Sequence, residues 1–469
     1  MDDILTIVKV AQSLWIACIV IMLFWKFRIG VAGYMAYMFL VPYMKIDFGG
    51  LTLQWNIINI LLLFAFFVHR QRDYDEQPPL DWRPLLPFAL YFGISLLIMP
   101  FQDGLPFADA INSWRTQVLK YLILPFVLWN DICADYDSLK LYRNVTIGCI
   151  TIAALYGLCL TLSPGINPYM IILSVANGEE FNYAFAAGNS GLNENSTLSE
   201  GRLFGRISSV FSHPMTFGLF LGFALFYLYR NKDNLNRWLV FGLTLFLLTD
   251  IVVCGVRSVI IATFFAILVL LMQSRSYKLL LATIVGGIIL YAFIAFSPAL
   301  GTYIGSIFAQ NDSSFRGSTL AMRLAQWDGC LHEIQHTFIE GKGFGWTNYF
   351  LSQYESHPTM LNFESLIFVI LCNSGIIGVV IWTLMGIIIV RYNNWSNRIV
   401  AALLNSLFAF YIVYAIITGE YGYMQYFILF YILMLGEDLY RVDDEDTEEE
   451  EEEFEESAGP EASSLYNYS

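Results

Sequence analysis

Charged residues are scarce in this chain of 469 residues, since Asp, Glu, Lys and Arg together make up 14% of it. Soluble domains carry roughly 25%. Bases are absent after Arg441, whereas 13 of the 40 acidic residues lie between Asp443 and Glu461. The remaining 442 residues therefore hold 25 bases against 27 acids, and the formal net charge of −15 belongs to the tail. This balance excludes a nucleic-acid-binding protein and a soluble enzyme.

Paired cysteines are also absent. The seven cysteines are scattered, lie mostly inside apolar segments and form no C-x-x-C motif. We predict that they are small hydrophobic residues, neither disulfides nor metal ligands. No small-residue cleavage site follows the acidic start Met1-Asp2-Asp3 and its apolar segment, so no cleaved signal peptide is expected.

Two catalytic motifs are missing from the chain. The phosphate-binding pattern G-x-x-x-x-G-K-[ST] and the nucleophile pattern G-x-S-x-G do not occur. Nucleotide hydrolysis of the soluble type is therefore unsupported. The pattern H-E-x-x-H occurs once, at His332-Glu333-Ile334-Gln335-His336, but a single short match is a weak signal and we do not predict metalloprotease chemistry.

Long apolar segments dominate what is present, with 57% hydrophobic and 16% aromatic residues. A helix needs about 20 such residues to cross a bilayer. Thirteen segments approach this length, near residues 8–25, 29–44, 50–69, 84–101, 113–131, 143–163, 209–229, 237–254, 258–273, 277–297, 362–390, 398–417 and 422–436. We predict an all-α integral membrane protein, a polytopic bundle of about 12–14 transmembrane helices with a large, partly helical external loop.

The predicted organisation has six parts. They are N-terminal transmembrane helices (1–163), an external loop (164–208), central transmembrane helices (209–297), a large external loop (298–361), C-terminal transmembrane helices (362–440) and an acidic, disordered tail (441–469). In the second loop the apolar residues Leu320, Leu324, Trp327, Leu331, Ile334 and Phe338 recur at helical spacing. They predict an amphipathic helix of about 20 residues, stopped by Gly341, Gly343 and Gly345.

Lys and Arg collect in alternate links between the apolar segments, which sets the predicted orientation. With the N-terminus outside, the cytoplasmic links hold fifteen of the 25 bases: Lys26, Arg28, Arg70, Arg72, Arg83, Lys140, Arg143, Arg230, Lys232, Arg237, Arg275, Lys278, Arg391, Arg398 and Arg441. The external links after the second, fourth and twelfth segments hold only Lys45. The acidic tail is therefore expected in the cytoplasm.

Four arginines depart from this pattern, because they fall on the predicted external side. They are Arg202, Arg206, Arg257 and Arg323. Guanidinium groups recognise phosphate through two parallel hydrogen bonds. We predict that the four gather to bind a lipid-linked phosphate or pyrophosphate. The alternative is that each one reaches the membrane interface or pairs with a local acid.

Other polar residues lie near the same predicted side. Glu364 and Ser365 begin an apolar segment, and Glu364 is expected to act either as a general base or as a helix N-terminal acid. His213, in a Ser-His-Pro sequence, is either a helix-start residue or a catalytic group. Asp250 lies within an apolar segment, where we interpret it as the partner of one of the arginines.

Five sequence motifs occur in an order that resembles that of a known family. They run Arg206-x-x-x-x-Phe-Ser-His213-Pro214-x-x-x-Gly218, Val256-Arg257-Ser258, Arg323-x-x-x-Trp327, Gly341-x-Gly343-x-Gly345 and Glu364-Ser365-(x)9-Gly375-Ile376-Ile377-Gly378. Over roughly residues 200–390, the chain resembles the O-antigen ligase/polymerase superfamily of bacterial envelope glycosyltransferases.

The resemblance implies a transferase in a bacterial inner membrane that works on the periplasmic face and needs no nucleotide, metal or other cofactor. Its donor is glycan on undecaprenyl pyrophosphate. Arg206 and Arg257 match the arginines thought to hold the pyrophosphate, and Arg323 matches the loop arginine. With Arg202 these form the predicted substrate site. Glu364 is the expected base of an inverting displacement.

Three residues are possible accessories in this interpretation, namely His213, His357 and Ser365. Ligases of the family tend to carry His-Asn where this chain has Glu364-Ser365, which favours a polymerase. A ligase acting on lipid A core or another acceptor is the first alternative. A transporter or flippase for lipid-linked sugars or a small anion is the second. Expected partners are the lipid-linked oligosaccharide, membrane lipids, a chain-length regulator and a flippase, with no nucleic acid.

Overall fold

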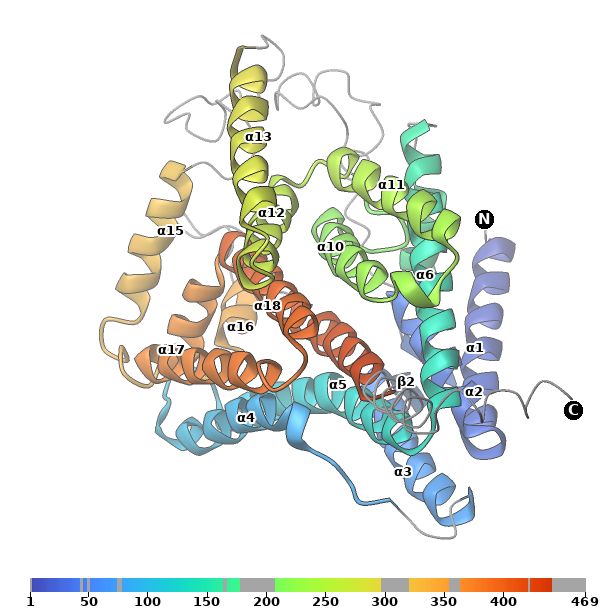
Figure 1. The fold of residues 1–469 in the computed structure, drawn as a ribbon. Helices are drawn as coiled ribbons and strands as arrows, with labels where there is room; N and C mark the ends of the chain where they lie inside the picture. Colours follow the sequence, from blue (N-terminus) through green and yellow to red (C-terminus); the bar gives the residue numbers. More distant parts are fainter. Residues whose placement is uncertain are drawn as a thin grey trace, which may run out of the picture.

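The computed structural model describes residues 2–42, 45–48, 51–73, 78–162, 167–177, 207–296, 320–353, 363–420 and 422–440. Helices make up most of these residues, which confirms the predicted all-α class (Figure 1). The exception is a short antiparallel hairpin of β1 (Lys45–Phe48) and β2 (Leu51–Gln54).

Each of the thirteen apolar segments corresponds to a helix. In chain order they are α1 (Asp2–Trp25), α2 (Phe27–Leu40), α3 (Trp55–Asp73), α4 (Leu86–Ile98), α5 (Phe107–Ala134), α6 (Tyr136–Leu162), α10 (Pro214–Arg230), α11 (Arg237–Val253), α12 (Arg257–Gln273), α13 (Tyr277–Phe296), α17 (Leu366–Asn393), α18 (Arg398–Thr418) and a last helix at 423–440. Short 3-10 turns lie at Arg83–Leu85, Met99–Phe101 and Lys232–Asn234.

Several helices have the length and composition of membrane spans. Among the described residues five qualify, at Leu5–Trp25, Arg83–Phe101, Tyr136–Leu162, Leu366–Asn393 and Arg398–Thr418. Shorter apolar helices cover Phe27–Leu40, Arg257–Gln273 and Tyr277–Gly287. Large apolar side chains such as Leu97 and Ile152 are exposed on the surfaces of these helices, as lipid-facing residues are. The protein is therefore a multi-pass membrane protein, while a count of 12–14 spans stays a prediction.

The contacts between helix ends agree with the predicted alternation of cytoplasmic and external sides along the chain. At one end, the contacts join links predicted to be cytoplasmic: Arg28 with Asp135, Arg143 with Glu437, and Arg398 with the carbonyl of Gln273. At the other end they join residues at or near the predicted external ends: Tyr169 with Leu40, Tyr414 with Met215, and Gln102 with Glu340. Which end faces the cytoplasm stays a prediction.

Helix α18 lies at the centre of the bundle and packs against α10, α12 and α17. The helix at 423–440 follows it and is buried along most of its length. Stacked aromatic rings hold the pair together, with the centroids of Tyr411 and Phe427 4.8 Å apart and the ring planes 7° from parallel. This aromatic core fixes where the loop between the two helices lies.

The large predicted loop contains two helices in its described part, α15 (Leu320–Glu333) and α16 (Trp346–Gln353). The predicted helix of about 20 residues is too long, because α15 ends at Glu333 and turns follow up to residue 340. Ile334 is buried, whereas Leu324 and Phe338 stay exposed. The apolar stripe is therefore divided between a short helix and the turn after it. In the first predicted loop, α7 (Pro168–Ala176) packs against α1.

Helix α17 is broken at Gly375, whose backbone (φ 61°, ψ −156°) is outside the helical region. The segment at 338–343 fills this break. Backbone N–H groups of Lys342 and Gly343 donate to the carbonyls of Cys372 and Asn373, while those of Ile376 and Ile377 donate to the carbonyls of Phe338 and Ile339. Irregular backbone inside a membrane protein requires such internal partners.

Two glycines make this close approach possible. A Cβ atom on Gly375 would lie 2.3 Å from the carbonyl oxygen of Ile339, and one on Gly341 would lie 2.5 Å from the backbone nitrogen of Gly375. Any side chain at either position would collide with main chain. The glycine motifs that carried the resemblance therefore join the predicted external segment to the broken helix.

Candidate functional site

The predicted site residues fall into three groups in the structure. Arg202, Arg206 and His357 lie outside the described residues. Arg323, Glu364 and Ser365 lie where α15 meets the start of α17. His213 and Arg257 lie at the starts of α10 and α12. Convergence of all four arginines on one site therefore stays a prediction.

Arg323 and Glu364 are in contact. The guanidinium Nη1 donates a hydrogen bond of 3.0 Å to the backbone carbonyl of Glu364, and Nη2 lies 3.8 Å from its Oε2. Both side chains are partly exposed, at 28% and 21%. The predicted general base is thus paired with the predicted loop arginine, although the two are 41 residues apart in the chain.

His213 and Ser365 each cap the N-terminus of a helix. His213 Nδ1 accepts a hydrogen bond of 3.0 Å from the backbone N–H of Met215, and the Ser365 hydroxyl accepts one of 3.3 Å from Ile367. Capping of this kind satisfies a backbone donor that the helix leaves unpaired.

Arg257 is the first residue of α12, and its side chain is partly buried. Helix α12 runs antiparallel to α18, because Gln273 at its far end contacts Asn405 and Arg398 near the start of α18. The sixteen residues from Arg257 to Gln273 span about 24 Å at a rise of ~1.5 Å per residue. Arg257 therefore lies level with the C-terminal end of α18.

Asp250 contacts no arginine among the described residues. Its side chain is fully buried in α11, and both carboxyl oxygens lack a hydrogen-bond partner among the described residues. It faces Gly157 of α6, where an added Cβ would lie 3.3 Å from Oδ1. Since an isolated buried carboxylate is costly, its pairing with an arginine finds no support in the described part of the chain.

Two charged residues that we did not predict lie at the end of α18. Glu420 accepts hydrogen bonds from the Tyr411 hydroxyl at 2.8 Å and from the backbone N–H of Met424 at 3.1 Å. Burial raises the pKa of Glu420, and these hydrogen bonds partly offset the rise. Lys120 of α5 lies close enough for Glu420 to act on its charge. An ionisable residue inside the predicted 113–131 span was the signal for Lys120.

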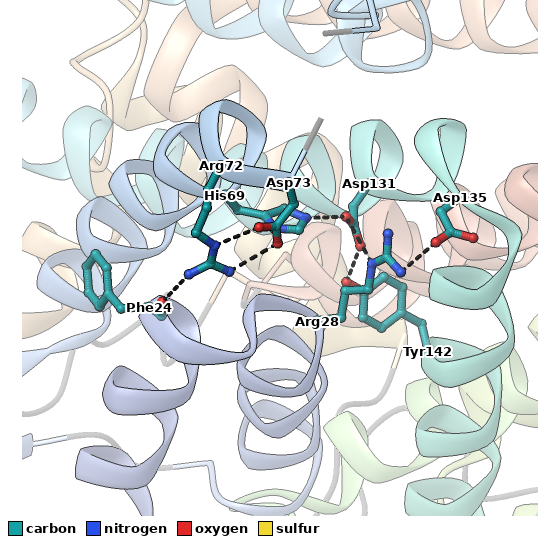
Figure 2. Close-up of polar contacts among 8 residues, drawn as sticks. All are labelled: Phe24, Arg28, His69, Arg72, Asp73, Asp131, Asp135 and Tyr142. Atoms are coloured by element: carbon teal, nitrogen blue, oxygen red, sulfur yellow. Dashed lines mark hydrogen bonds and ion pairs between the residues drawn. The ribbon is translucent and has the colours of Figure 1, made fainter. Parts of the chain in front are cut away.

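A second polar cluster lies at the opposite end of the bundle, around the buried Asp131 (Figure 2). Asp131 Oδ2 accepts a hydrogen bond of 2.6 Å from the Tyr142 hydroxyl. Its Oδ1 lies 3.4 Å from His69 Nε2 and 3.8 Å from Arg28 Nε, and Arg28 also pairs with Asp135 at 2.5 Å. These contacts join α2, α3, α5 and α6.

A cleft of about 500 Å³ adjoins this cluster and is lined by charges of both signs. His69 Nδ1 lies 2.8 Å from Asp73, and Arg72 binds Asp73 and the carbonyl of Phe24 (Figure 2). Most of the charges are thus already paired within the protein. We interpret the cluster as a set of ion pairs and hydrogen bonds that hold these helices together, because such pairing leaves little net charge to attract a ligand.

Comparison with known families identifies one segment. Residues 242–383 match the family model described as O-antigen ligase. The matched segment runs from within α11 to within α17, just under a third of the chain, and contains Arg257, Arg323 and Glu364. No curated protein matches the chain.

The match lies inside the range over which the sequence motifs indicated this superfamily, and the resemblance is thereby confirmed. It does not separate polymerases from ligases. The described geometry adds the broken helix α17 and the contact between Arg323 and Glu364 to this segment. Residues 242–383 of this multi-pass membrane protein are an O-antigen ligase family domain.

Proposed function

We propose that this protein is a membrane glycosyltransferase that polymerises lipid-linked oligosaccharide repeats into O-antigen or another surface polysaccharide. The donor is a repeat on undecaprenyl pyrophosphate, and the reaction takes place on the outer face of the inner membrane. The match of residues 242–383 to the O-antigen ligase family carries this proposal, because five of the eight site residues chosen from the sequence lie inside it.

The arginines bind the pyrophosphate in this mechanism. Arg257 begins α12 and lies level with the C-terminal end of α18, which we predict to be external, and Arg202 and Arg206 precede α10 in the chain. As the bond from the anomeric carbon to the phosphate oxygen breaks, negative charge grows on the pyrophosphate. Guanidinium groups fixed in a water-poor site stabilise that charge.

Glu364 takes the proton of the acceptor hydroxyl. The hydroxyl oxygen forms a bond to the anomeric carbon on the face opposite the leaving pyrophosphate, which inverts the configuration. The contact with Arg323 holds Glu364 at the start of α17, and Ser365 supports it by capping that helix. His213 and His357 are accessory residues in this proposal, and neither carries the proton transfer.

The sequence Glu364-Ser365 favours a polymerase over a ligase. Ligases of the family tend to carry His-Asn at the head of this helix, and here a carboxylate stands at the first of the two positions. A ligase that transfers glycan to lipid A core or another acceptor is the second candidate, since it would use the same donor and the same arginines.

The broken helix α17 argues against transport. Transporters use the ends of broken helices to hold ions or substrates near the bilayer midplane. In this protein the break at Gly375 is filled by the chain's own segment at 338–343, whose backbone groups satisfy those of α17. Two carbonyls and two N–H groups of α17 at the break are therefore already bonded within the protein.

A deletion strain tests the proposal through its glycolipids. If the protein is a polymerase, the strain carries single repeats on the lipid A core and lacks long chains. Polymer that remains on the carrier, with bare core, would identify a ligase instead. Unchanged glycolipids together with altered solute uptake would overturn the transferase assignment.

A further inference from the structure

Lys120 is an unpaired cation on α5. Among the described residues it makes no hydrogen bond and no ion pair, and Glu420 is the charged group that acts on it. The carboxylate of Glu420 is already engaged by Tyr411 and the backbone of Met424. Lys120 as a whole residue is partly exposed.

The loop after α18 brings the backbone close to this lysine. Gly422 has φ +85°, and a Cβ atom there would lie 3.9 Å from Lys120 Nζ and 3.4 Å from the Tyr121 hydroxyl. A positive φ favours glycine at this position, and the loop backbone here comes close to Lys120 Nζ. Lys120 therefore lies level with an interhelical loop at one end of the bundle.

Lys120 and Arg257 belong to helices with different neighbours. Helix α5, which carries Lys120, packs against α3, α4 and α6, whereas α12, which begins at Arg257, packs against α18, α13, α10 and α11. The two cations therefore come from different parts of the bundle.

Polar residues continue along the same face of α5. Ser113, Gln117 and Lys120 are spaced four and three residues apart, which places them on one side of a helix, and all three are partly exposed. Ser113 lies beside Gly345, where a Cβ would be 2.9 Å from its hydroxyl oxygen. This polar stripe therefore runs between the 341–345 turn and the loop after α18.

We propose that Lys120 binds the diphosphate of a polyprenyl-linked substrate, at a point separate from Arg257. The inference rests on the proposed function, in which a polymerase must hold two lipid-linked diphosphates, one on the donor and one on the acceptor. Two like-charged groups repel each other, so a protein that holds both needs two cationic points. The polar stripe on α5 supplies hydroxyl and amide groups for the sugars next to the diphosphate.

Native mass spectrometry of the purified full-length protein tests the proposal, with undecaprenyl pyrophosphate as the probe. The wild-type protein is expected to bind two molecules. Lys120→Gln is expected to bind one, with the affinity of the lost site reduced at least tenfold, and Lys120→Arg to restore binding. Lys9→Gln is the matched control, because Lys9 is an exposed lysine on α1.

The outcomes separate this inference from the proposed function. If Arg257→Ala and Lys120→Gln each retain one molecule and the double variant retains none, two sites exist. If both variants lose the same single molecule, Lys120 shares the Arg257 site and the second site is wrong. Unchanged binding and polymer synthesis in Lys120→Gln would overturn any role for Lys120. Absence of binding by the wild type would instead contradict the proposed function.

A purely structural role for Lys120 gives a different result. In that case Lys120→Gln lowers the melting temperature of the protein without ligand and leaves the affinity of the remaining folded protein unchanged. Melting temperature is therefore measured beside binding, and equal stability with weaker binding is the expected result.

Discussion

Arg323 donates a hydrogen bond of 3.0 Å to the backbone carbonyl of Glu364, which ties the loop helix α15 to the residue just ahead of α17. The contact spans 41 residues of sequence and joins two side chains that we selected independently as site residues. Because the bond uses the main chain of Glu364, changes to the Glu364 side chain leave it intact. The carboxylate can therefore be tested without releasing the loop.

Glu364→Gln is expected to reduce the rate of polymer synthesis by about 10²–10⁴-fold, because the amide cannot accept the acceptor proton. The measurement is chain growth from lipid-linked repeats in membranes that contain equal amounts of protein. Glu333→Gln is the control, since Glu333 belongs to the same loop helix and pairs with Lys342. Full activity of Glu364→Gln would reduce Glu364 to a helix-end acid.

Arg257→Ala is expected to lower polymer synthesis by about 10²–10³-fold, as loss of one fixed donor to a developing charge does. Arg237→Ala is the matched control, because Arg237 also begins a membrane helix but stacks on Trp238 at the other end of α11. Normal chain length in Arg257→Ala, with the protein inserted at wild-type levels, would contradict the pyrophosphate role.

Gly375→Ala is expected to prevent stable folding, because the new Cβ would lie 2.3 Å from the carbonyl oxygen of Ile339 and the backbone has a positive φ. Yield and thermal unfolding in detergent measure the effect. Gly242→Ala is the control, since nothing lies within 4 Å of a Cβ there and alanine favours the helix by about 1 kcal/mol. Equal stability of the two variants would show that the break in α17 tolerates a side chain.

Glu437→Ala is expected to destabilise the protein by about 3–5 kcal/mol, because it leaves a buried guanidinium without its partner. Arg143 donates two hydrogen bonds of 2.7 Å to Glu437, and their side chains are 8% and 2% exposed. The exposed pair Lys140–Asp137 is the comparison, and Lys140→Ala should cost no more than about 1 kcal/mol. Thermal unfolding in detergent gives both values, and a similar small cost for each would refute the buried-pair argument.

Reporter fusions test the orientation. Green fluorescent protein fused after Ser469 is expected to fluoresce, because it folds in the cytoplasm, and alkaline phosphatase at the same position is expected to be inactive. Alkaline phosphatase fused after Asn177 is expected to be active, since that residue lies in the predicted external loop. The reverse pattern would place Arg257 and Glu364 on the cytoplasmic side and remove the proposed site.

Much of the architecture could be predicted from local pattern. Apolar segments such as 398–417 coincide with helices within a few residues, because hydrophobic length and helix formation are properties of a continuous stretch of chain. The amphipathic helix beginning at Leu320 was predicted too long, since Ile334 is buried by a turn after Glu333 and not by a longer helix. Apolar spacing alone does not distinguish these two cases.

The candidate site could also be predicted only in part from the sequence. Arg257, Arg323 and Glu364 could be selected because each is an ionisable residue beside an apolar segment. The partners could not be selected. Asp250 was assigned an arginine that it does not contact among the described residues, and Lys120 was overlooked inside a span.

The sequence by itself determined the membrane class, the places of the helices and the superfamily of residues 242–383, because hydropathy, charge and motif order are all read along the chain. Only the tertiary structure decided that Gly341 meets Gly375, that Arg323 meets Glu364 and that Lys120 faces the loop at Gly422. The physical reason is distance along the chain. Such contacts form when helices far apart in sequence pack together, and no local pattern encodes which faces will meet.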